Sequence, residues 1–222
     1  YFAKVIKKKS LSGYIFINLH KIIKIMTNKI VLIFLLFGLL SCNIVTDEND
    51  DKKLIMNQFA KGFFIEEFEN YKKITVSNPW QNAVNEQYEY FLVDKNKEID
   101  KIIKNKNVIR TPVSSVICLS TTYVSYIDVL DEIQTIVGVS GTKYVYNEIL
   151  QQRINEALVH DVGFEQSLDI EKIISLKPDV VFVYDITGSL MSKYEQLKKF
   201  DIQVVIVGEY LENNPLGKAE WV

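Results

Sequence analysis

The sequence predicts an α/β fold in which a parallel sheet, covered by helices on both faces, follows a small antiparallel β segment. From Arg110 onward, short and almost continuous apolar runs alternate with stretches of helical periodicity. That order is typical of parallel strands buried on both faces. Between residues 62 and 93, aromatic or β-branched residues alternate with polar ones, which indicates antiparallel strands.

The antiparallel segment consists of two alternating runs, GFFIEEFENYKKITVSNPW and EQYEYFLVD, with a break at Glu69-Asn70. We expect these runs to form two or three strands. The stretch from Val93 to Lys106 is rich in lysine and aspartate. We expect it to be a solvated connection that leads into the parallel sheet.

The parallel sheet is predicted to begin with a strand over 113–119, in the apolar run VSSVICL. Ser120, Thr121 and Thr122 follow, and their hydroxyl groups are suited to cap the amphipathic helix expected over 123–133. A second strand over 135–139 ends at Ser140-Gly141.

The third unit opens at Asp169, which is suited to cap a helix that Lys177-Pro178 stops, because proline cannot continue a helix. The predicted elements are a helix over 170–176, a strand over 180–184, a helix over 190–200 and a strand over 203–207. Asn214 followed by Pro215 is a strong helix start. Because that helix would stop within about two turns, we expect the protein to continue beyond Val222.

Residues 30–40 form an apolar run, IVLIFLLFGLL, with Lys29 before it and Ser41-Cys42 after it. A basic residue, a short apolar run and a small residue describe a secretory signal. Crossing a membrane takes about 20 apolar residues, roughly twice the length of this run, so the run is too short for a membrane-spanning helix. A buried core helix is the alternative, but the polar stretch NIVTDENDDKK that follows favours a tether.

Residues 1–25 contain no Asp or Glu and are dominated by Ile, Lys, Tyr, Phe and Asn. AT-rich DNA upstream of a gene would give this amino-acid composition if it were read in frame with the gene. Met26 stands directly before the apolar run, so we expect Met26 to be the true start and 1–25 to be untranslated. Residues 26–41 are then a lipoprotein signal peptide, 42–57 a tether, and 58–106 the β segment with its linker.

Charge and cysteine content exclude several classes of function. The first 41 residues carry seven lysines and no acid, so residues 42–222 hold 19 basic against 28 acidic residues, a formal net charge of −9. This balance argues against nucleic-acid binding. Cys118 lies in an apolar run and is expected to be a small buried hydrophobe. His160 is the one histidine after the leader, which excludes a metal site built from several histidines. With this one histidine, no Ser-His-Asp or Cys-His set can be assembled at the strand ends.

In parallel α/β sheets, ligands bind outside the carboxyl ends of the strands. The residues expected at that edge as ligand contacts are Thr121, Thr122, Tyr123, Gly141, Tyr144, Phe164, Glu165, Gln166 and Asp185. These residues also have purely structural alternatives. The threonines could simply cap a helix, Tyr144 could pack on its own loop, and Phe164 could belong to the core. Asp185 and Glu209 could form an acid/base pair, but no other catalytic group accompanies them.

Four segments then carry a family resemblance: VICLSTTYVSYIDVL, IVGVSGTKYV, DVGFEQSLDIEKIISLKPDVVFVY and NPLGKAEW. Together they resemble the substrate-binding lipoproteins of ABC importers for iron–siderophore and cobalamin chelates, the class III periplasmic binding proteins. The resemblance covers residues 110–222, and its most specific piece is VG…LDIEKIISLKPDVVFVY.

The resemblance implies two α/β lobes joined by a long helix, with the ligand held between them. Residues 107–212 would be the amino-terminal ligand-binding lobe, and 213–222 the start of the linking helix. It also implies that Glu171 docks on the ABC permease and that Cys42 is lipidated. The lobe is acidic and shows no cluster of Arg or Lys at its strand ends, although an anionic ferric chelate would favour cations.

We therefore expect a non-enzymatic capture protein for an iron(III)-siderophore-type chelate, with cobalamin or haem as the alternative ligand. No cofactor and no resident metal are expected, since the ligand itself is the metal chelate. Its partners would be the permease and, through lipid on Cys42, a membrane facing the periplasm or the outer cell surface. The alternatives of another class are a surface-anchored hydrolase with catalytic residues beyond Val222, and an adhesion lipoprotein.

Overall fold

The computed structural model describes residues 53–55, 57–164 and 167–222. The predicted upstream segment, the signal peptide, Cys42 and most of the tether lie outside the described residues, and so do Glu165 and Gln166. Those assignments stay predictions. In the part of the chain that is described, no helix is long and apolar enough to cross a membrane.

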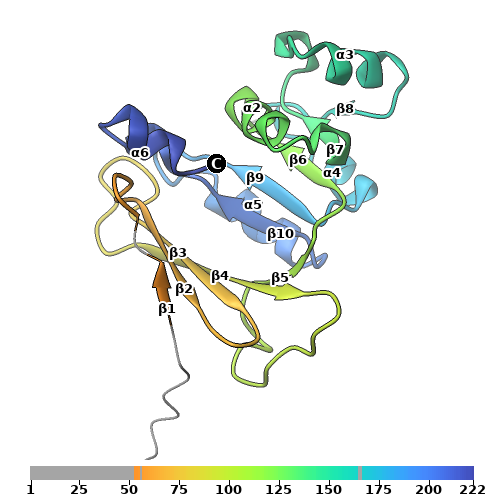
Figure 1. The fold of residues 1–222 in the computed structure, drawn as a ribbon. Coiled ribbons are helices and arrows are strands. Elements are labelled where there is room, and N and C mark those ends of the chain that lie inside the picture. The colour runs from red at the N-terminus through yellow and green to blue at the C-terminus, as the bar shows by residue number, and fades with distance from the viewer. Residues whose placement is uncertain (1–52, 56, 165–166) are drawn as a thin grey trace, which may run out of the picture. The chain divides into compact units, whose positions relative to one another are not determined.

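The antiparallel segment is confirmed and is larger than expected. Its sheet has the order β1-β2-β3-β4-β5 (Figure 1). The strands are β1 (Lys53–Ile55), β2 (Phe63–Glu67), β3 (Lys72–Ser77), β4 (Gln87–Asp94) and β5 (Val108–Thr111). The pairs from β1 to β4 are antiparallel, whereas β5 runs parallel to β4. Thus β1 lies within the stretch expected as a tether, and β5 within the range assigned to the main lobe.

The second sheet is wholly parallel and has the order β10-β9-β6-β7-β8. Its strands are β6 (Val116–Cys118), β7 (Ile136–Val139), β8 (His160–Asp161), β9 (Val180–Val183) and β10 (Gln203–Ile206). The four predicted strands are confirmed, each within its expected range. The short β8 was not predicted, because two residues carry no periodicity.

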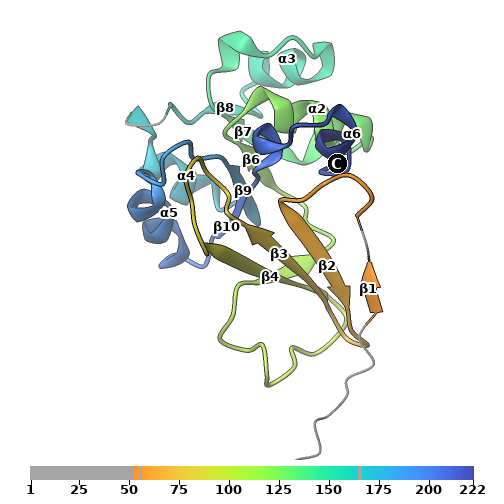
Figure 2. The same cartoon turned by 90° about the vertical axis from the view of Figure 1, so that its left-hand side faces the viewer.

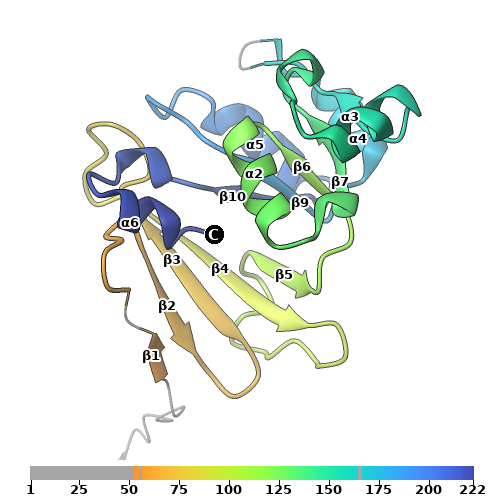
Figure 3. The same cartoon turned by 45° about the horizontal axis from the view of Figure 1, so that its top comes forward.

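Helices cover both faces of the parallel sheet, as predicted (Figure 3). They are α2 (Thr121–Val129), α3 (Glu148–Asn155), α4 (Ile170–Leu176), α5 (Met191–Lys198) and α6 (Pro215–Ala219). Side chains of α2 and α3 belong to one core cluster, and those of α4 and α5 to the cluster on the other face. The predicted caps are confirmed at Asp169 and Asn214, whose side chains accept from Lys172 N and Leu216 N.

The antiparallel sheet packs into the same core as α2. Phe63, Val76, Tyr90 and Ile109 share one buried cluster with Tyr123 and other residues of the parallel domain. In addition, the hydroxyl of Tyr90, a residue only 2% exposed, accepts a hydrogen bond from Ile206 N at 3.0 Å. β10 is an edge strand, so Tyr90 pairs a backbone N–H that the sheet itself leaves open.

Tyr90→Phe is expected to lower the free energy of unfolding by about 1–2 kcal/mol, because it leaves the buried Ile206 N–H without an acceptor and keeps the ring in place. Urea denaturation of both proteins measures the difference. A matched control is Tyr88→Phe on the same strand, at a residue that is only partly buried. Equal losses in the two variants would contradict a specific role for the Tyr90 hydroxyl.

Candidate functional site

The carboxyl edge of the parallel sheet begins at the N-terminus of α2. Ser120 is the N-cap, and its hydroxyl accepts from Thr122 N at 3.2 Å. Thr121 and Thr122 are exposed in the first turn, so their side chains are available at this edge. Tyr123 is only 2% exposed, and its hydroxyl lies 3.4 Å from the carbonyl oxygens of Val183 and Val207.

Tyr123 therefore lies beneath the edge and presents no surface to a ligand. The helical spacing explains this position, since Tyr123 and Ile127 are four residues apart and point to the same buried face. The predicted role of Tyr123 as a ligand contact finds no support in its position.

The next part of the edge is a loop that opens at Gly141, after β7. Gly141 has φ +75°, a left-handed conformation that favours glycine. A Cβ added there would overlap Cζ of Phe164 and would lie 2.9 Å from Cδ2 of Tyr144. Glycine at this position thus lets two aromatic rings close over the backbone.

Tyr144 and Phe164 meet edge to face, with ring centroids 5.8 Å apart. They remain 48% and 41% exposed, so their contact with each other leaves much of both rings open. The Lys143 ammonium lies 4.9 Å from the centre of the Tyr144 ring, within cation–π range. Tyr146, which follows, is 85% exposed. The structure therefore brings together the aromatic residues that the sequence placed on separate loops.

A groove with a volume of about 500 Å³ lies between α2 and this loop. Its lining consists of Thr121, Thr122, Val124, Ser125, Asp128, Tyr144, Val145, Tyr146 and Asn147. The lining combines hydroxyl groups, aromatic rings and an amide, and its charged member is Asp128. The volume lies in the range of pockets that hold small organic ligands.

The carboxylate of Asp161, at the end of β8, connects the two loops that carry the rings. Its Oδ1 accepts from Gly141 N at 3.1 Å and from Gly163 N at 2.9 Å. Its Oδ2 accepts from Thr142 N at 3.1 Å and from the Thr142 hydroxyl at 3.3 Å. Asp161 is not among the site residues predicted from the sequence. The signal that could have found it is an acid two positions before Gly163, at a strand end.

Burial raises the pKa of Asp161, but the hydrogen bonds from Gly163, Gly141 and Thr142 outweigh it, and the net pKa lies below the usual value. Asp179, before β9, is similar. Burial raises its pKa, but hydrogen bonds from Ser114 and Ser115 lower the pKa by more, so the net pKa is below the usual value. A carboxyl with a lowered folded pKa stabilises the fold above its unfolded pKa of about 4, and this contribution is lost as the pH falls through the folded value.

We therefore expect the free energy of unfolding to be steady from pH 7 to about pH 5 and to fall below about pH 4. Urea denaturation at a series of pH values measures this dependence. In Asp161→Asn/Asp179→Asn, the deficit relative to the unchanged protein should be largest at neutral pH and should shrink on acidification. A deficit that grows as the pH falls would contradict the sign of these shifts.

At β9 and β10 the carboxyl edge is covered by the chain itself. Trp80 lies against Gly188, where an added Cβ would meet Trp80 Cε2 at 2.9 Å. Gln81 N donates to Ile186 O at 3.1 Å. The loop that joins β3 to β4 thus occupies this half of the edge, and the groove lies in the other half.

Asp185 belongs to the covered half and is 2% exposed. Its Oδ1 accepts from Thr187 N and Gly188 N, and its Oδ2 from Leu190 N. Asp185 therefore organises the turn before α5, and its predicted ligand contact finds no support in its position. Glu209 is also buried, which raises its pKa, and its Oε2 has no hydrogen-bond partner among the described residues.

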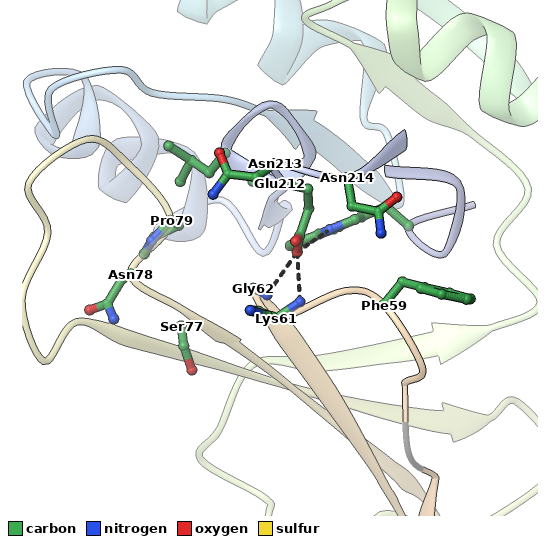
Figure 4. A pocket seen from close by; sticks show the side chains of 12 residues that line it. Phe59, Lys61, Gly62, Ser77, Asn78, Pro79, Glu212, Asn213 and Asn214 are labelled. Carbon is green, nitrogen blue, oxygen red and sulfur yellow. Dashed lines mark hydrogen bonds between the residues drawn. The ribbon is translucent and has the colours of Figure 1, made fainter. Parts of the chain in front are cut away.

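A second hollow, of about 340 Å³, lies where the chain before β2 meets the segment around α6 (Figure 4). In Figure 2 these two segments lie side by side. Oε1 of Glu212 accepts from Lys61 N, Gly62 N and Trp221 Nε1 at 2.9, 2.8 and 3.2 Å. None of the predicted ligand contacts lines this hollow. The carboxylate that lines the hollow, Glu212, is engaged in hydrogen bonds between the two segments that form it.

Glu171 lies in the first turn of α4 and is exposed. It lines neither the groove nor the second hollow, so its side chain is available to another protein. Within the described ranges, no group of three or more His, Cys, Asp or Glu residues could hold a metal ion.

Comparison with known proteins found no matching family model. An uncharacterized lipoprotein of Methanocaldococcus jannaschii is 32% identical over 130 residues, which are 55% of this chain and 31% of that protein. The iron-uptake ABC transporter substrate-binding protein PiuA of Streptococcus pneumoniae has a TM-score of 0.33 at 19% identity, over 42% of this chain and 30% of that one.

The periplasmic vitamin B12-binding protein BtuF of Vibrio cholerae has a TM-score of 0.31 at 20% identity, over 42% of this chain and 34% of that one. The siderophore-binding protein BauB, solved with two molecules of acinetobactin and ferric iron, has a TM-score of 0.31 at 22% identity, over 42% and 30%. The aligned part of this chain thus spans about a third of the length of each relative.

Proposed function

We propose that the chain is the capture lobe of an ABC-importer binding protein, which holds a metal chelate and delivers it to a permease without chemical change. The observation that carries the proposal is the open groove at the carboxyl ends of β6 and β7, flanked by the exposed Tyr144–Phe164 pair. Exposed rings on a rigid edge offer flat surfaces to a planar or ring-rich ligand. The segments that resemble such binding proteins include both loops.

The ligand we propose is an iron(III)-siderophore-type chelate, whose aromatic or chelate rings would contact Tyr144 and Phe164. One observation favours a second candidate. The groove lining carries one acid and no cation, whereas an anionic ferric chelate would favour positive charge. A ligand nearer neutrality, such as cobalamin, would need no compensating cation. Haem stays as a further alternative that this observation does not favour, because its two propionates are anionic.

The test is a binding titration of the protein encoded by the complete reading frame. Ferric catecholate and hydroxamate siderophores, cobalamin and haem are added separately, and binding is followed by equilibrium dialysis. We expect one class of chelate to bind at micromolar concentration or tighter and the metal-free siderophores to bind less well. If no member of the panel binds, the proposed function is wrong.

Delivery requires a surface for the permease, and we propose that Glu171 belongs to it. Glu171→Ala should leave chelate affinity unchanged and reduce chelate-dependent ATPase activity of the reconstituted importer by about tenfold, because charged pairs at interfaces contribute about 1–3 kcal/mol. Glu132→Ala, at an exposed position near the amino edge of the sheet, is the control. A loss of chelate affinity in Glu171→Ala would instead place this residue in the ligand site.

Anchoring is the last part of the proposal. Lipid on Cys42 would hold the lobe at the membrane that carries the permease, on the periplasmic side or at the outer surface. The apolar run before Cys42 and the polar tether after it support this assignment.

A further inference from the structure

One carboxylate fixes the relative position of two loops that are not adjacent in the sequence. Asp161 accepts four hydrogen bonds, from the backbone of Gly141, Thr142 and Gly163 and from the Thr142 hydroxyl. The first loop carries Tyr144 and the second carries Phe164. Bonds to an ionised acceptor are stronger than those between neutral groups, so the two loops are cross-linked at their bases.

Other backbone bonds act mainly within each loop. Tyr144 N donates to Gly141 O at 3.0 Å and Val145 N to Thr142 O at 3.1 Å, while Ser167 N donates to Phe164 O at 2.6 Å. Before the loops, Val162 N donates to Val139 O at 3.0 Å and joins the two strand ends. Gly141 and Gly163 both have positive φ, at +75° and +79°, and glycine has the widest backbone freedom of any residue. The bonds to Asp161 act at these two glycines.

The aromatic pair depends on both loops at once. Phe164 Cζ occupies the space that a Cβ on Gly141 would need, and Tyr144 Cδ2 lies 2.9 Å from the position of that Cβ. Such close packing requires the two loop bases to be in register. A shift of one loop against the other would separate the rings and change the surface that flanks the groove.

We propose that Asp161 is the positioning residue of the ligand site: it does not touch the ligand but holds the Tyr144 and Phe164 loops in the arrangement that binds it. The effect on affinity rests on the proposed function, whereas the effect on the loops does not. A ligand that binds to mobile loops must order them, which costs free energy. Loops that are already held in the binding arrangement avoid this cost, so the affinity is higher.

The structure supplies a matched control at the opposite edge of the same sheet. Asp179 also joins two segments through its carboxylate: its Oδ2 accepts from Ser114 N at 2.6 Å, Ser114 Oγ at 2.8 Å and Ser115 N at 3.2 Å. Asp161 and Asp179 are both partly exposed, and both have lowered pKa values. They differ in which edge of the sheet they organise.

The experiment compares Asp161→Asn with Asp179→Asn in the complete protein. Asparagine keeps the size of the side chain, but in Asp161→Asn either one acceptor is lost or an amide NH₂ faces a backbone N–H. Thr142→Val removes the hydroxyl bond alone, and Thr142→Ser restores the hydroxyl. Amide hydrogen exchange is measured for 141–146 and 162–168, and chelate affinity by equilibrium dialysis.

We expect Asp161→Asn to accelerate amide hydrogen exchange in both loops and to weaken chelate affinity by about tenfold. The loss of one hydrogen bond to a charged group changes an equilibrium constant by about a factor of ten. Thr142→Val should give smaller changes in the same direction, and Thr142→Ser none. Asp179→Asn should accelerate exchange at Ser114 and Ser115 and leave affinity unchanged.

Two results would overturn the proposal: both loops staying protected in Asp161→Asn, or Asp179→Asn reducing affinity as much as Asp161→Asn does. A third result concerns the function. If no chelate binds the unchanged protein, the proposed function fails, while hydrogen exchange in the variants still decides whether Asp161 holds the two loops.

Discussion

Glu212→Ala is expected to lower the free energy of unfolding by about 3 kcal/mol, the largest stability effect of any single change described above. Glu212 is 9% exposed, and its Oε1 accepts three N–H groups from two segments that are about 160 residues apart in the chain. Its removal leaves the N–H groups of Gly62 and Trp221 without their acceptor. It also weakens the packing of Trp221 on Phe63, whose ring centroids are 4.6 Å apart.

Urea denaturation measures this loss, and two further variants serve as controls. Glu212→Gln retains an oxygen acceptor and should lose less stability than Glu212→Ala. Glu220 accepts from Gln58 N, Phe59 N and Ala60 N in the same loop, but it is more exposed. Glu220→Ala should therefore be the milder change. If Glu220→Ala costs as much as Glu212→Ala, burial of the carboxylate is not what gives Glu212 its importance.

The double change Tyr144→Ala/Phe164→Ala is expected to weaken chelate binding by about 100-fold, the largest effect predicted on function. Truncating an aromatic residue at the centre of a binding surface commonly costs 2 kcal/mol or more, and about 1.4 kcal/mol corresponds to a factor of ten. Both rings are more than a third exposed, so their removal should change stability little. Equilibrium dialysis gives the affinity, and urea denaturation verifies the fold.

The control for the aromatic pair is Phe200→Ala, which removes a ring that is 57% exposed at the opposite edge of the sheet. It should leave chelate affinity unchanged. Tyr144→Phe is a second control, since it keeps the ring and removes the hydroxyl. If the double variant binds like the unchanged protein, the chelate does not contact this edge.

Periodicity in the sequence was sufficient for most of the parallel domain. The apolar runs predicted β6, β7, β9 and β10, because strands buried on both faces have no polar alternation to obscure them. Caps at Asp169 and Asn214 placed two helix starts to the residue. By contrast, β5 was not predicted as a strand, since its pairing with β4 is decided across a long loop and by no local pattern.

The candidate site was predictable in part, for physical reasons that differ among its residues. Gly141 and Tyr144 follow a predicted strand end, and the rule that ligands bind at the carboxyl edge located them. Phe164 was predicted from the loop that enters the third unit, because β8 itself was not predicted. Tyr123 was placed there by the same rule, but its helical spacing with Ile127 turns it inward. Asp185 lies beneath the edge because the loop that contains Trp80 covers that half of the sheet, a contact between distant segments that no local pattern contains.

We propose the groove at the carboxyl ends of β6 and β7 as the site where the chelate binds. Amide hydrogen exchange with and without a saturating chelate locates this binding without any substitution. We expect slower exchange in 121–125 and 141–147 and unchanged exchange in 57–62 and 212–221. Slower exchange confined to those last two segments, around the hollow of Figure 4, would contradict it.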